Sequence, residues 1–146
     1  MSLLSALSVS ASGMSAQRQR TELLVENLAN SDTTRTPEGG PYRRKDVVFT
    51  SDPSAAQFSS LFENEANNDN SVGVRVSEVV TDTRDPEKRY VPGHPDADAD
   101  GYVAFPRVNP AEDMVDLLGA SRNYAANVSA ISAVKDMIQK SLDLFR

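Results

Sequence analysis

The last quarter of the chain, residues 109–146, reads NPAEDMVDLLGASRNYAANVSAISAVKDMIQKSLDLFR and decides the fold. Asn109 is a good N-cap, and Pro110 fits the first helical position, where its missing N–H costs nothing. Large apolar residues then recur at steps of three and four or their sums, which predicts one amphipathic helix. They are Met114, Leu117, Leu118, Tyr124, Val128, Ile131, Val134, Ile138, Leu142 and Phe145. About 36 residues at roughly 1.5 Å each would span about 54 Å, too long for a compact domain of this size.

The other end of the chain predicts a second helix, from Leu3 to Leu28. Its apolar stripe is narrow and consists of Leu3, Leu7, Met14, Leu24 and Leu28. Many small serines lie around this stripe and would let other backbones come close. Gly13 is expected to weaken the helix by about 1 kcal/mol relative to Ala. Asn, Ser and Asp side chains between residues 27 and 32 favour a helix end there.

All eight prolines lie between Pro37 and Pro110, and five of the seven glycines lie in the same interval, so both ends of the chain are free to form long helices. Alternation over Val72–Val76 predicts a strand, and Val47–Phe49 and Tyr102–Phe105 are shorter candidates. Residues 62–71 are predicted to form a polar loop. We therefore expect an α+β fold with three parts: a helix in residues 1–30, a small β-rich and loop-rich domain in residues 31–108, and a helix in residues 109–146.

Composition excludes several classes of function. The formal net charge of -6 argues against nucleic-acid binding, and the absence of Cys removes disulfides and thiolate sites. No stretch approaches the roughly 20 apolar residues that cross a bilayer. The N-terminus lacks the positive region of a cleavable secretory signal. No nucleophile elbow or phosphate loop occurs, so we expect no enzyme activity and no cofactor.

Two long amphipathic helices can pair in a coiled-coil-like way, parallel or antiparallel, but such a pair leaves each stripe with an open flank. Burial of one Leu or Ile stabilises by roughly 1.5 to 3 kcal/mol, so the stripes favour association with further chains. A self-assembling structural protein is the leading interpretation. The alternative is a soluble regulatory or chaperone-like module that binds a partner helix. The residues expected at the assembly interface are Leu3, Leu7, Met14, Leu24, Leu28, Met114, Leu117, Tyr124, Val128, Ile131, Val134, Ile138 and Leu142.

Several motifs resemble a known family, the axial proteins of the bacterial flagellum, which include rod, hook and hook-associated proteins. At the N-terminal end the resemblance lies in residues 12–17 (SGMSAQ), residues 27–30 (NLAN) and Thr33-Thr34. At the C-terminal end it lies in residues 92–103, 106–109, 121–128 and 137–144, which are similar to the small C-type rod proteins. Arg107 and Ser31-Asp32 depart from the family pattern.

This resemblance implies a structural subunit of the proximal rod, the torque-transmitting drive shaft around the export channel. It implies export by the flagellar type III apparatus without a cleaved signal peptide, and a place in the basal body within the periplasm. The implied partners are other rod subunits, copies of the chain itself, the membrane ring with its rod adaptor, and the export apparatus. It also implies terminal helices packed around the channel, with the middle domain outside them.

Three polar groups are weighed as sites. Asp96, Asp98, Asp100 and Gly101 fit the first half of an EF-hand loop, but Arg107 stands where the bidentate Glu would be, so a solvated turn is favoured over a metal site. His94 is interpreted as a turn or packing residue rather than a general base. The basic residues 43–45 are interpreted as a solvated face rather than a nucleic-acid site.

The N-terminal helix is also expected to be largely disordered before assembly. Its stripe is narrow and rich in Ser, and an isolated helix gains most of its stability from tertiary packing. Residues 1–30 would then become ordered through burial against neighbouring subunits.

Overall fold

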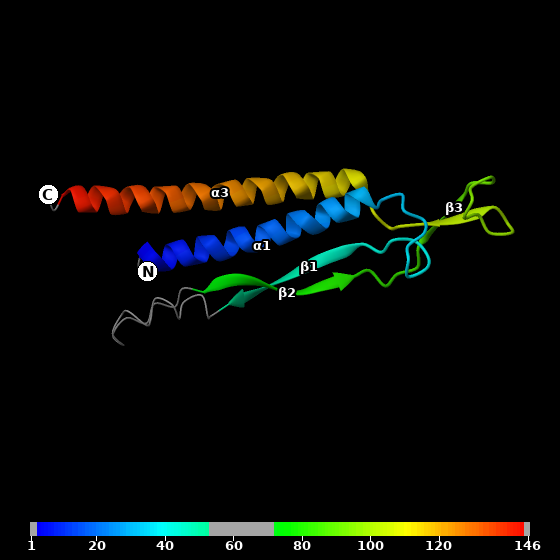
Figure 1. Ribbon diagram of the computed structural model, residues 1–146, viewed down its shortest axis with the longest axis horizontal. Coiled ribbons are helices and arrows are strands. Elements are labelled where there is room, and N and C mark those ends of the chain that lie inside the picture. The colour runs from blue at the N-terminus through cyan, green and yellow to red at the C-terminus, as the bar shows by residue number, and fades with distance from the viewer. Residues whose placement is uncertain (1–2, 53–71, 145–146) are drawn as a thin grey trace.

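The computed structural model describes residues 3–52 and 72–144, and two long helices dominate it (Figure 1). Helix α1 spans Leu3–Ala29 and helix α3 spans Pro110–Asp143. They pack side by side and run antiparallel, so that both ends of the chain lie at the same end of the molecule. Asn109 caps α3 by accepting a hydrogen bond from the Ala111 backbone N–H at 3.2 Å, with Pro110 at the first helical position. The two predicted helices are thus confirmed.

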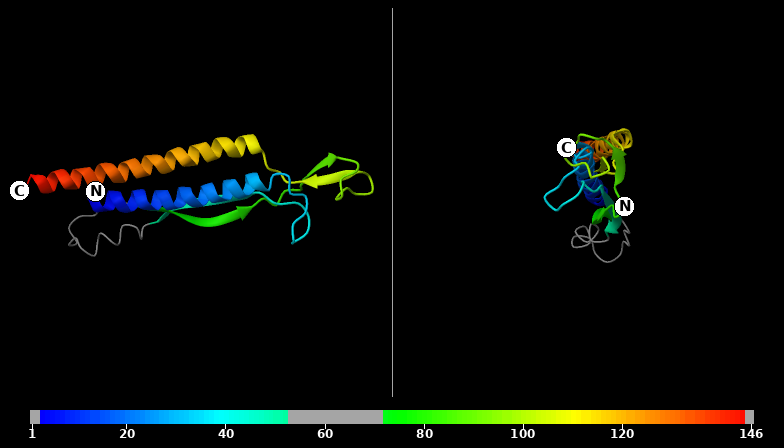
Figure 2. Two further views of the ribbon diagram at one scale, coloured as in Figure 1. Left: turned by 45° about the horizontal axis from the view of Figure 1, so that its top comes forward. Right: turned by 90° about the vertical axis from the view of Figure 1, so that its right-hand side faces the viewer.

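Strand β1 (Lys45–Asp52) and strand β2 (Gly73–Thr81) form an antiparallel hairpin that lies along α1. The register shifts between Val48 and Phe49, where Ser77 is the extra residue of a β-bulge and its hydroxyl donates to the Val48 carbonyl at 3.0 Å. Because α1 packs against α3 and also against both strands, it is the middle of three layers (Figures 1 and 2). The expected open flank of α1 is therefore covered by the chain's own hairpin.

Strands β3 (Glu87–Tyr90) and β4 (Tyr102–Phe105) form a second antiparallel hairpin beyond the ends of the helices. Tyr90 lies edge-on to Tyr102 across the hairpin, with ring centroids 5.4 Å apart. The sequence predicts strand β4 but not β3. The α+β class is confirmed by the helices and the two hairpins, whereas the predicted loop at residues 62–71 lies outside the described residues.

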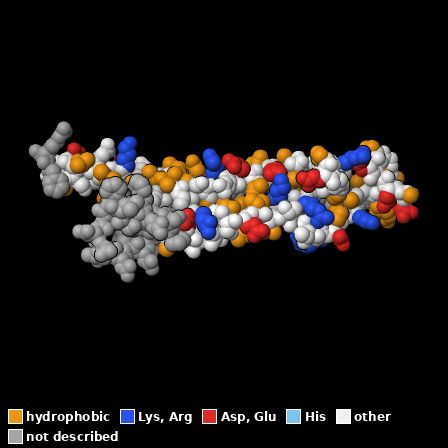
Figure 3. Space-filling view, turned by 60° about the horizontal axis from the view of Figure 1, so that its bottom comes forward, with side chains coloured by type: hydrophobic (Ala, Val, Ile, Leu, Met, Phe, Trp, Pro, Cys, Tyr) orange, Lys and Arg blue, Asp and Glu red, His pale blue; other side chains and the backbone are white. Residues whose placement is uncertain are grey.

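The core within one chain is small. Among the described residues, the buried hydrophobic ones are Ala16, Leu24, Tyr42, Val103, Val108, Ala120 and Val134. In the same part of the chain, 19 large hydrophobic residues are exposed. Figure 3 shows hydrophobic side chains spread along the molecule, while charged side chains are denser towards the end that carries β3 and β4. A chain that leaves most of its large apolar residues exposed has surface for further association.

Candidate assembly site

One side of α3 forms the seam with α1. The buried and half-buried positions of α3 recur at steps of three and four and include Asp113, Leu117, Ala120, Asn127, Ile131, Val134 and Ile138. On α1, Leu24 is buried and Leu7, Met14 and Leu28 are half-buried. Eight of the residues expected at the interface therefore lie in packing within the chain, namely Leu7, Met14, Leu24, Leu28, Leu117, Ile131, Val134 and Ile138.

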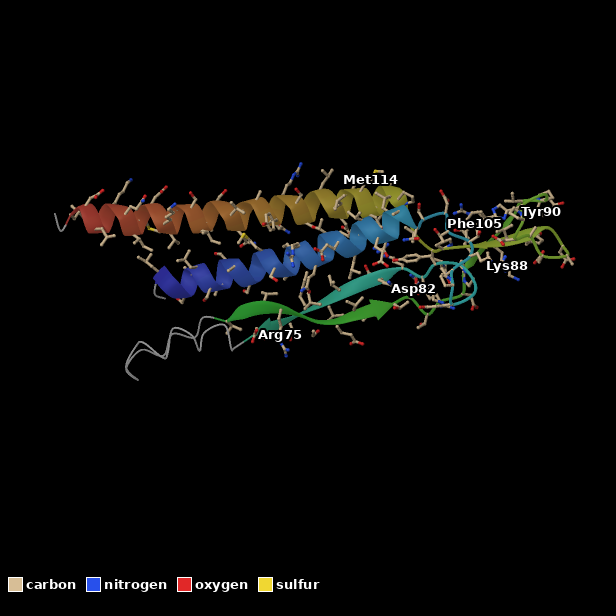
Figure 4. All side chains as sticks on the ribbon, viewed as in Figure 1. Arg75, Asp82, Lys88, Tyr90, Phe105 and Met114 are labelled. Atoms are coloured by element: carbon tan, nitrogen blue, oxygen red, sulfur yellow. The ribbon has the colours of Figure 1, made fainter. Side chains whose placement is uncertain are left out.

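The other expected interface residues are exposed. Their relative exposures are 41% for Leu3, 52% for Met114, 41% for Tyr124, 46% for Val128 and 64% for Leu142. Met114 points away from α1, on the outer side of α3 (Figure 4). This outer side also carries Leu118, which is 60% exposed and which the list of expected residues did not include. Except for Leu3, which belongs to α1, these residues give α3 further apolar surface that α1 does not cover.

The end of α3 also extends past the start of α1. Asn127 lies against Gly13, and Arg20 forms an ion pair with Asp116 at 3.4 Å, which together fix the antiparallel alignment. In this alignment Leu3, ten residues before Gly13, lies level with Met137, ten residues after Asn127. The last turn of α3, which includes Leu142, therefore continues without α1 beside it, as Figure 1 shows. We call residues 139–143 the overhang.

Gly13 has a packing role that the sequence did not reveal. A Cβ atom at this position would lie 3.1 Å from the Asn127 Nδ2 and 3.4 Å from its Cγ. The absence of a side chain lets the Asn127 side chain approach the α1 backbone closely. The propensity cost expected of Gly13 is thus accompanied by a closer helix pair.

Asn27 forms the centre of the joint where α1, the loop after it and β1 meet. It is fully buried, its Nδ2 donates to the Lys45 carbonyl at 2.8 Å, and its Oδ1 accepts from the Lys45 N–H at 3.0 Å. The Tyr42 hydroxyl also donates to Oδ1, at 2.9 Å. Burial, followed by the nearby Glu26 carboxylate, raises the pKa of Tyr42 to about 12. The side-chain amide of Asn27 thus pairs with the backbone N–H and carbonyl of Lys45 as a neighbouring strand would.

The other polar residues of the N-terminal motifs hold the turn that follows α1. Asn30 Nδ2 donates to the Glu26 carbonyl at 2.9 Å, and the Thr33 hydroxyl donates to Asn30 Oδ1 at 3.1 Å. The Thr34 hydroxyl reaches the distant Asp96 carboxylate at 2.8 Å. These side chains connect the end of α1 to the β3–β4 hairpin, so the motif fixes the geometry of the joint.

We expect Asn27→Ala to lower the free energy of unfolding by about 2 to 4 kcal/mol, because it leaves the Lys45 backbone groups and the Tyr42 hydroxyl without partners. Chemical denaturation of the monomer measures this. The matched control is Asn30→Ala, which removes two bonds at a more exposed position and should cost about 1 kcal/mol or less. Equal losses from the two variants would contradict the central role of Asn27.

A second polar contact joins Arg44, the residue before β1, to α3. Arg44 Nη2 lies 3.0 Å from Asp113 Oδ1, and the two side chains are only 15% and 0% exposed. Arg44 also bonds Asp46, with Nε to Oδ2 at 3.2 Å, and Lys45 pairs with Glu26 at 2.6 Å. The interpretation of residues 43–45 as a solvated face is therefore wrong for Arg44, which the fold buries against a carboxylate of α3.

Asp113 is held by charge and not by hydrogen bonds. Neither of its carboxylate oxygens has a hydrogen-bond partner among the described residues, although Arg44 lies at ion-pair distance. Burial therefore raises the pKa of Asp113, against the lowering effect of Arg44. Asp46, Asp116 and Glu112 raise this pKa further.

The acidic segment between β3 and β4 forms a turn. Asp98 Oδ1 accepts from the N–H groups of Asp100 at 3.0 Å and Tyr102 at 2.8 Å. Gly101 has a φ of +80°, and a Cβ there would lie 2.9 Å from the Tyr90 ring. His94 Nδ1 accepts from the Asp96 N–H at 3.1 Å. In the part of the chain that the structure describes, no three His, Cys, Asp or Glu residues are grouped to hold a metal.

Asp98→Ala with Asp100→Ala is expected to loosen the turn by about 1 kcal/mol and to leave assembly unchanged. The control is Asp98→Asn, which keeps the Oδ1 acceptor but removes the charge. It should match the wild type, since a turn needs the acceptor and a calcium site needs the charge. Hydrogen exchange at Tyr102 and calcium titration by calorimetry check both variants. Calcium-dependent protection lost in Asp98→Asn would contradict the turn interpretation.

Two family models match the ends of the chain. "Flagella basal body rod protein" matches residues 7–35, which cover most of α1 and the turn after it. "Flagellar basal body rod FlgEFG protein C-terminal" matches residues 99–144, which cover β4 and α3. Among the described helices, none is long and apolar enough to cross a membrane. Most of both end helices thus lies in the segments that match the rod-protein families of the flagellar basal body.

Curated relatives are similar over the whole length. The chain is 41% identical to the flagellar basal-body rod protein FlgC of Bacillus subtilis, with 99% of each chain covered. It is 39% identical to FlgC of Salmonella typhimurium, covering 99% of this chain and 98% of the relative. It is 37% identical to FlgC of Borreliella burgdorferi, with coverage of 100% and 99%. The chain belongs to the FlgC family of flagellar basal-body rod proteins.

Proposed function

We propose that this chain is a structural subunit of the flagellar rod that self-assembles through its terminal helices. The observation that carries the proposal is the 41% identity to a FlgC rod protein over 99% of both chains. The geometry supports the mode of assembly, because α3 presents exposed Met114, Val128 and Leu142 outside its seam with α1. Burying such side chains against neighbouring helices stabilises each contact by roughly 1.5 to 3 kcal/mol.

Residues 1–30 and 109–146 form the proposed assembly core, and residues 31–108 lie outside it. Within this arrangement the rod would be a torque-transmitting shaft around the export channel. The joint supports this division of roles: Asn27 ties α1 to β1, and the Arg44–Asp113 pair ties α3 to the residue before β1. Because the helices are fixed to the outer residues 31–108, such a subunit can transmit torque between its helical core and its outer part.

The proposed partners are other rod subunits, copies of the chain itself, the membrane ring with its rod adaptor, and the export apparatus. The proposed location is the basal body within the periplasm, reached without cleavage of a signal peptide. We propose no catalytic activity, in line with the structural rod proteins among its relatives. The comparisons give no support to a regulatory or chaperone-like module.

Deletion of the gene in the source bacterium, followed by complementation, tests the function. We expect the deletion to abolish swimming and to leave basal bodies without a complete rod in electron micrographs, and we expect the wild-type gene to restore both. Complete rods and normal swimming in the deletion strain would overturn the proposal. A deletion of a flagellar gene outside the rod is the control for indirect loss of motility.

The disorder expected of α1 in the free monomer remains a prediction, and we now expect it mainly in the N-terminal half of the helix. The C-terminal half of α1 holds buried Leu24 and Asn27, whereas the N-terminal half is Ser-rich. We expect fast hydrogen exchange of dilute monomer over residues 3–15, with slower exchange over residues 24–29. Assembled rods should protect both. Slow, cooperative exchange throughout α1 in the monomer would show that the helix pair is already stable alone.

A further inference from the structure

The β1–β2 hairpin has two edges, and α1 closes each of them at one end only. Both backbone groups of Lys45 bond the Asn27 side chain, so in β1 they point away from β2. The Val74 N–H of β2 donates to the Ser12 hydroxyl at 3.0 Å, so it points away from β1. These two contacts identify which residues of the hairpin direct their backbone groups outward.

Outward-pointing residues alternate with ladder-bonded ones along an antiparallel pair. Counting in steps of two from Lys45 and Val74, and using the observed register across the bulge, gives the outward set. It comprises Val47, Phe49 and Ser51 on β1 and Val76, Val79 and Thr81 on β2. The described sheet has no third strand to pair with them. Neither strand contains Pro, which often protects exposed edges.

A groove runs beside the free edge of β1. It has a volume of about 200 Å³ and separates the strand from α1. Its walls are Leu23 and Leu24 from α1 and Val47 and Phe49 from β1, with Arg20, Lys45 and Asp46 at the polar margin. An edge of unpaired backbone groups next to a groove of mixed polar and apolar lining is suited to adding a strand, because main-chain bonds supply affinity and the groove takes side chains.

We propose that this edge receives the β2 edge of a second copy of the chain, which continues the sheet from subunit to subunit. The inference rests on the proposed assembly and specifies one of its contacts. Val79 is 45% exposed and lies opposite Val47 in the hairpin, so the two side chains share the face towards α1. In the continued sheet, the Val79 side chain of the added strand enters the groove.

Polarity favours this pairing over two β2 edges meeting. Adding the β2 edge of one copy to the β1 edge of the next keeps the whole sheet antiparallel and leaves all copies pointing the same way. Two β2 edges in antiparallel contact would instead relate copies by a two-fold axis and close after one pair. Only the first arrangement can propagate in a directional assembly. The strands lie along the helices, so successive copies would sit side by side across the long axis (Figure 1).

The spacing is compatible with the other layers. Two strands at about 4.8 Å repeat every 9.6 Å or so, and packed helices lie about 8–10 Å apart. Because α1 lies over the hairpin, the α1 helices of neighbouring copies would come into contact at the same repeat. The same translation from one copy to the next therefore continues the sheet and brings neighbouring α1 helices to packing distance.

Residue-resolved hydrogen exchange on monomer and on assembled protein tests the edges directly. The Val47 and Val79 amides should exchange fast in the monomer, and assembly should slow them by at least 100-fold. The Val80 amide is the control: this side chain is 44% exposed, but its N–H points into the hairpin, so it should be protected in both states. Assembly that leaves the Val47 and Val79 amides fast would overturn the inference while leaving the proposed function intact.

Disulfide trapping identifies the occupant, since the chain has no Cys of its own. Two single variants, Val47→Cys and Val79→Cys, are assembled separately and as a mixture and then oxidised. We expect most disulfide dimers to form in the mixture, between Val47→Cys of one copy and Val79→Cys of another. Thr81→Cys and Val76→Cys are tested in place of Val79→Cys, because the register between copies can place either residue opposite Val47. Dimers formed equally by Val79→Cys alone would show two β2 edges meeting and would overturn the head-to-tail pairing. If the wild type forms no assembly, the proposed function itself fails.

Discussion

Leu142→Asp is expected to abolish incorporation into the rod, and with it swimming, without changing the stability of the monomer. Leu142 is 64% exposed and lies in the overhang, past the start of α1. A surface substitution of this kind changes the free energy of unfolding by about 0.5 kcal/mol or less. In an assembled rod the same carboxylate would be buried among neighbouring helices, where an unpaired charge costs far more than the lost Leu contact.

Ala133→Asp is the matched control, because it introduces the same charge at another exposed position of α3. Ala133 lies nine residues before Leu142, or about 2.5 turns, so the two side chains occupy opposite faces of the helix. The lower helix propensity of Asp should cost this variant about 0.7 kcal/mol or less. We therefore expect a folded monomer that still enters the rod.

Ile131→Asp is the contrasting variant. Ile131 lies in the seam with α1, so this change should destabilise the monomer by about 2 to 4 kcal/mol. Swimming assays, purified basal bodies and monomer denaturation separate it from Leu142→Asp and Ala133→Asp. Normal swimming of Leu142→Asp would count against the overhang as an assembly surface.

The sequence predicts the end helices well because their signals are local. Asn109, Pro110 and the helix-ending polar residues after Leu28 place the boundaries within one or two residues. Strand β3 shows the limit of such signals. Glu87–Tyr90 carries no alternation and is exposed throughout, so its structure depends on pairing with β4 rather than on its own composition.

Apolar spacing alone cannot separate the two surfaces of α3. Steps of three and four connect Leu117, Ile131 and Val134 in the seam, but they also connect Met114 to Leu118 on the outer side. Both sets satisfy one helical pattern, so the expected interface combines residues of the seam with exposed ones. Only the position of α1 decides which set remains for other subunits.

The joint is the least predictable part of the molecule. Local sequence indicates Asn27 only as a helix-ending residue, because its partners at Tyr42 and Lys45 are 15 and 18 residues away. Likewise, it assigns Arg44 to a solvated face, although the fold buries Arg44 together with Asp113 of α3. Polar residues with long-range partners give no periodic signal, so their role emerges only once the chain is folded.

The Arg44–Asp113 pair leads to the second large expected effect. Asp113→Ala should lower the free energy of unfolding by about 3 kcal/mol or more, because Arg44 is then left mostly buried, with Asp46 as its one ion-pair partner among the described residues. Replacing both residues, by Arg44→Met with Asp113→Leu, should restore stability to within about 1 kcal/mol of the wild type. Denaturation of the two single variants and the double variant completes the cycle. Additive losses would show that the two residues do not interact.

The pH dependence gives this pair a separate test. Burial raises the pKa of Asp113 above its value in the unfolded chain, about 3.9, so the folded protein holds this proton more strongly. The contribution of Asp113 to stability is therefore fully present below about pH 4 and is lost as the pH rises through the folded pKa. The Asp113→Asn variant has no carboxyl group at this position, so its stability does not fall with rising pH for this reason. The stability of the wild type relative to Asp113→Asn should thus fall as the pH rises above about 4. A relative stability that rises over this range would mean that Arg44 outweighs burial and holds the pKa below its ordinary value.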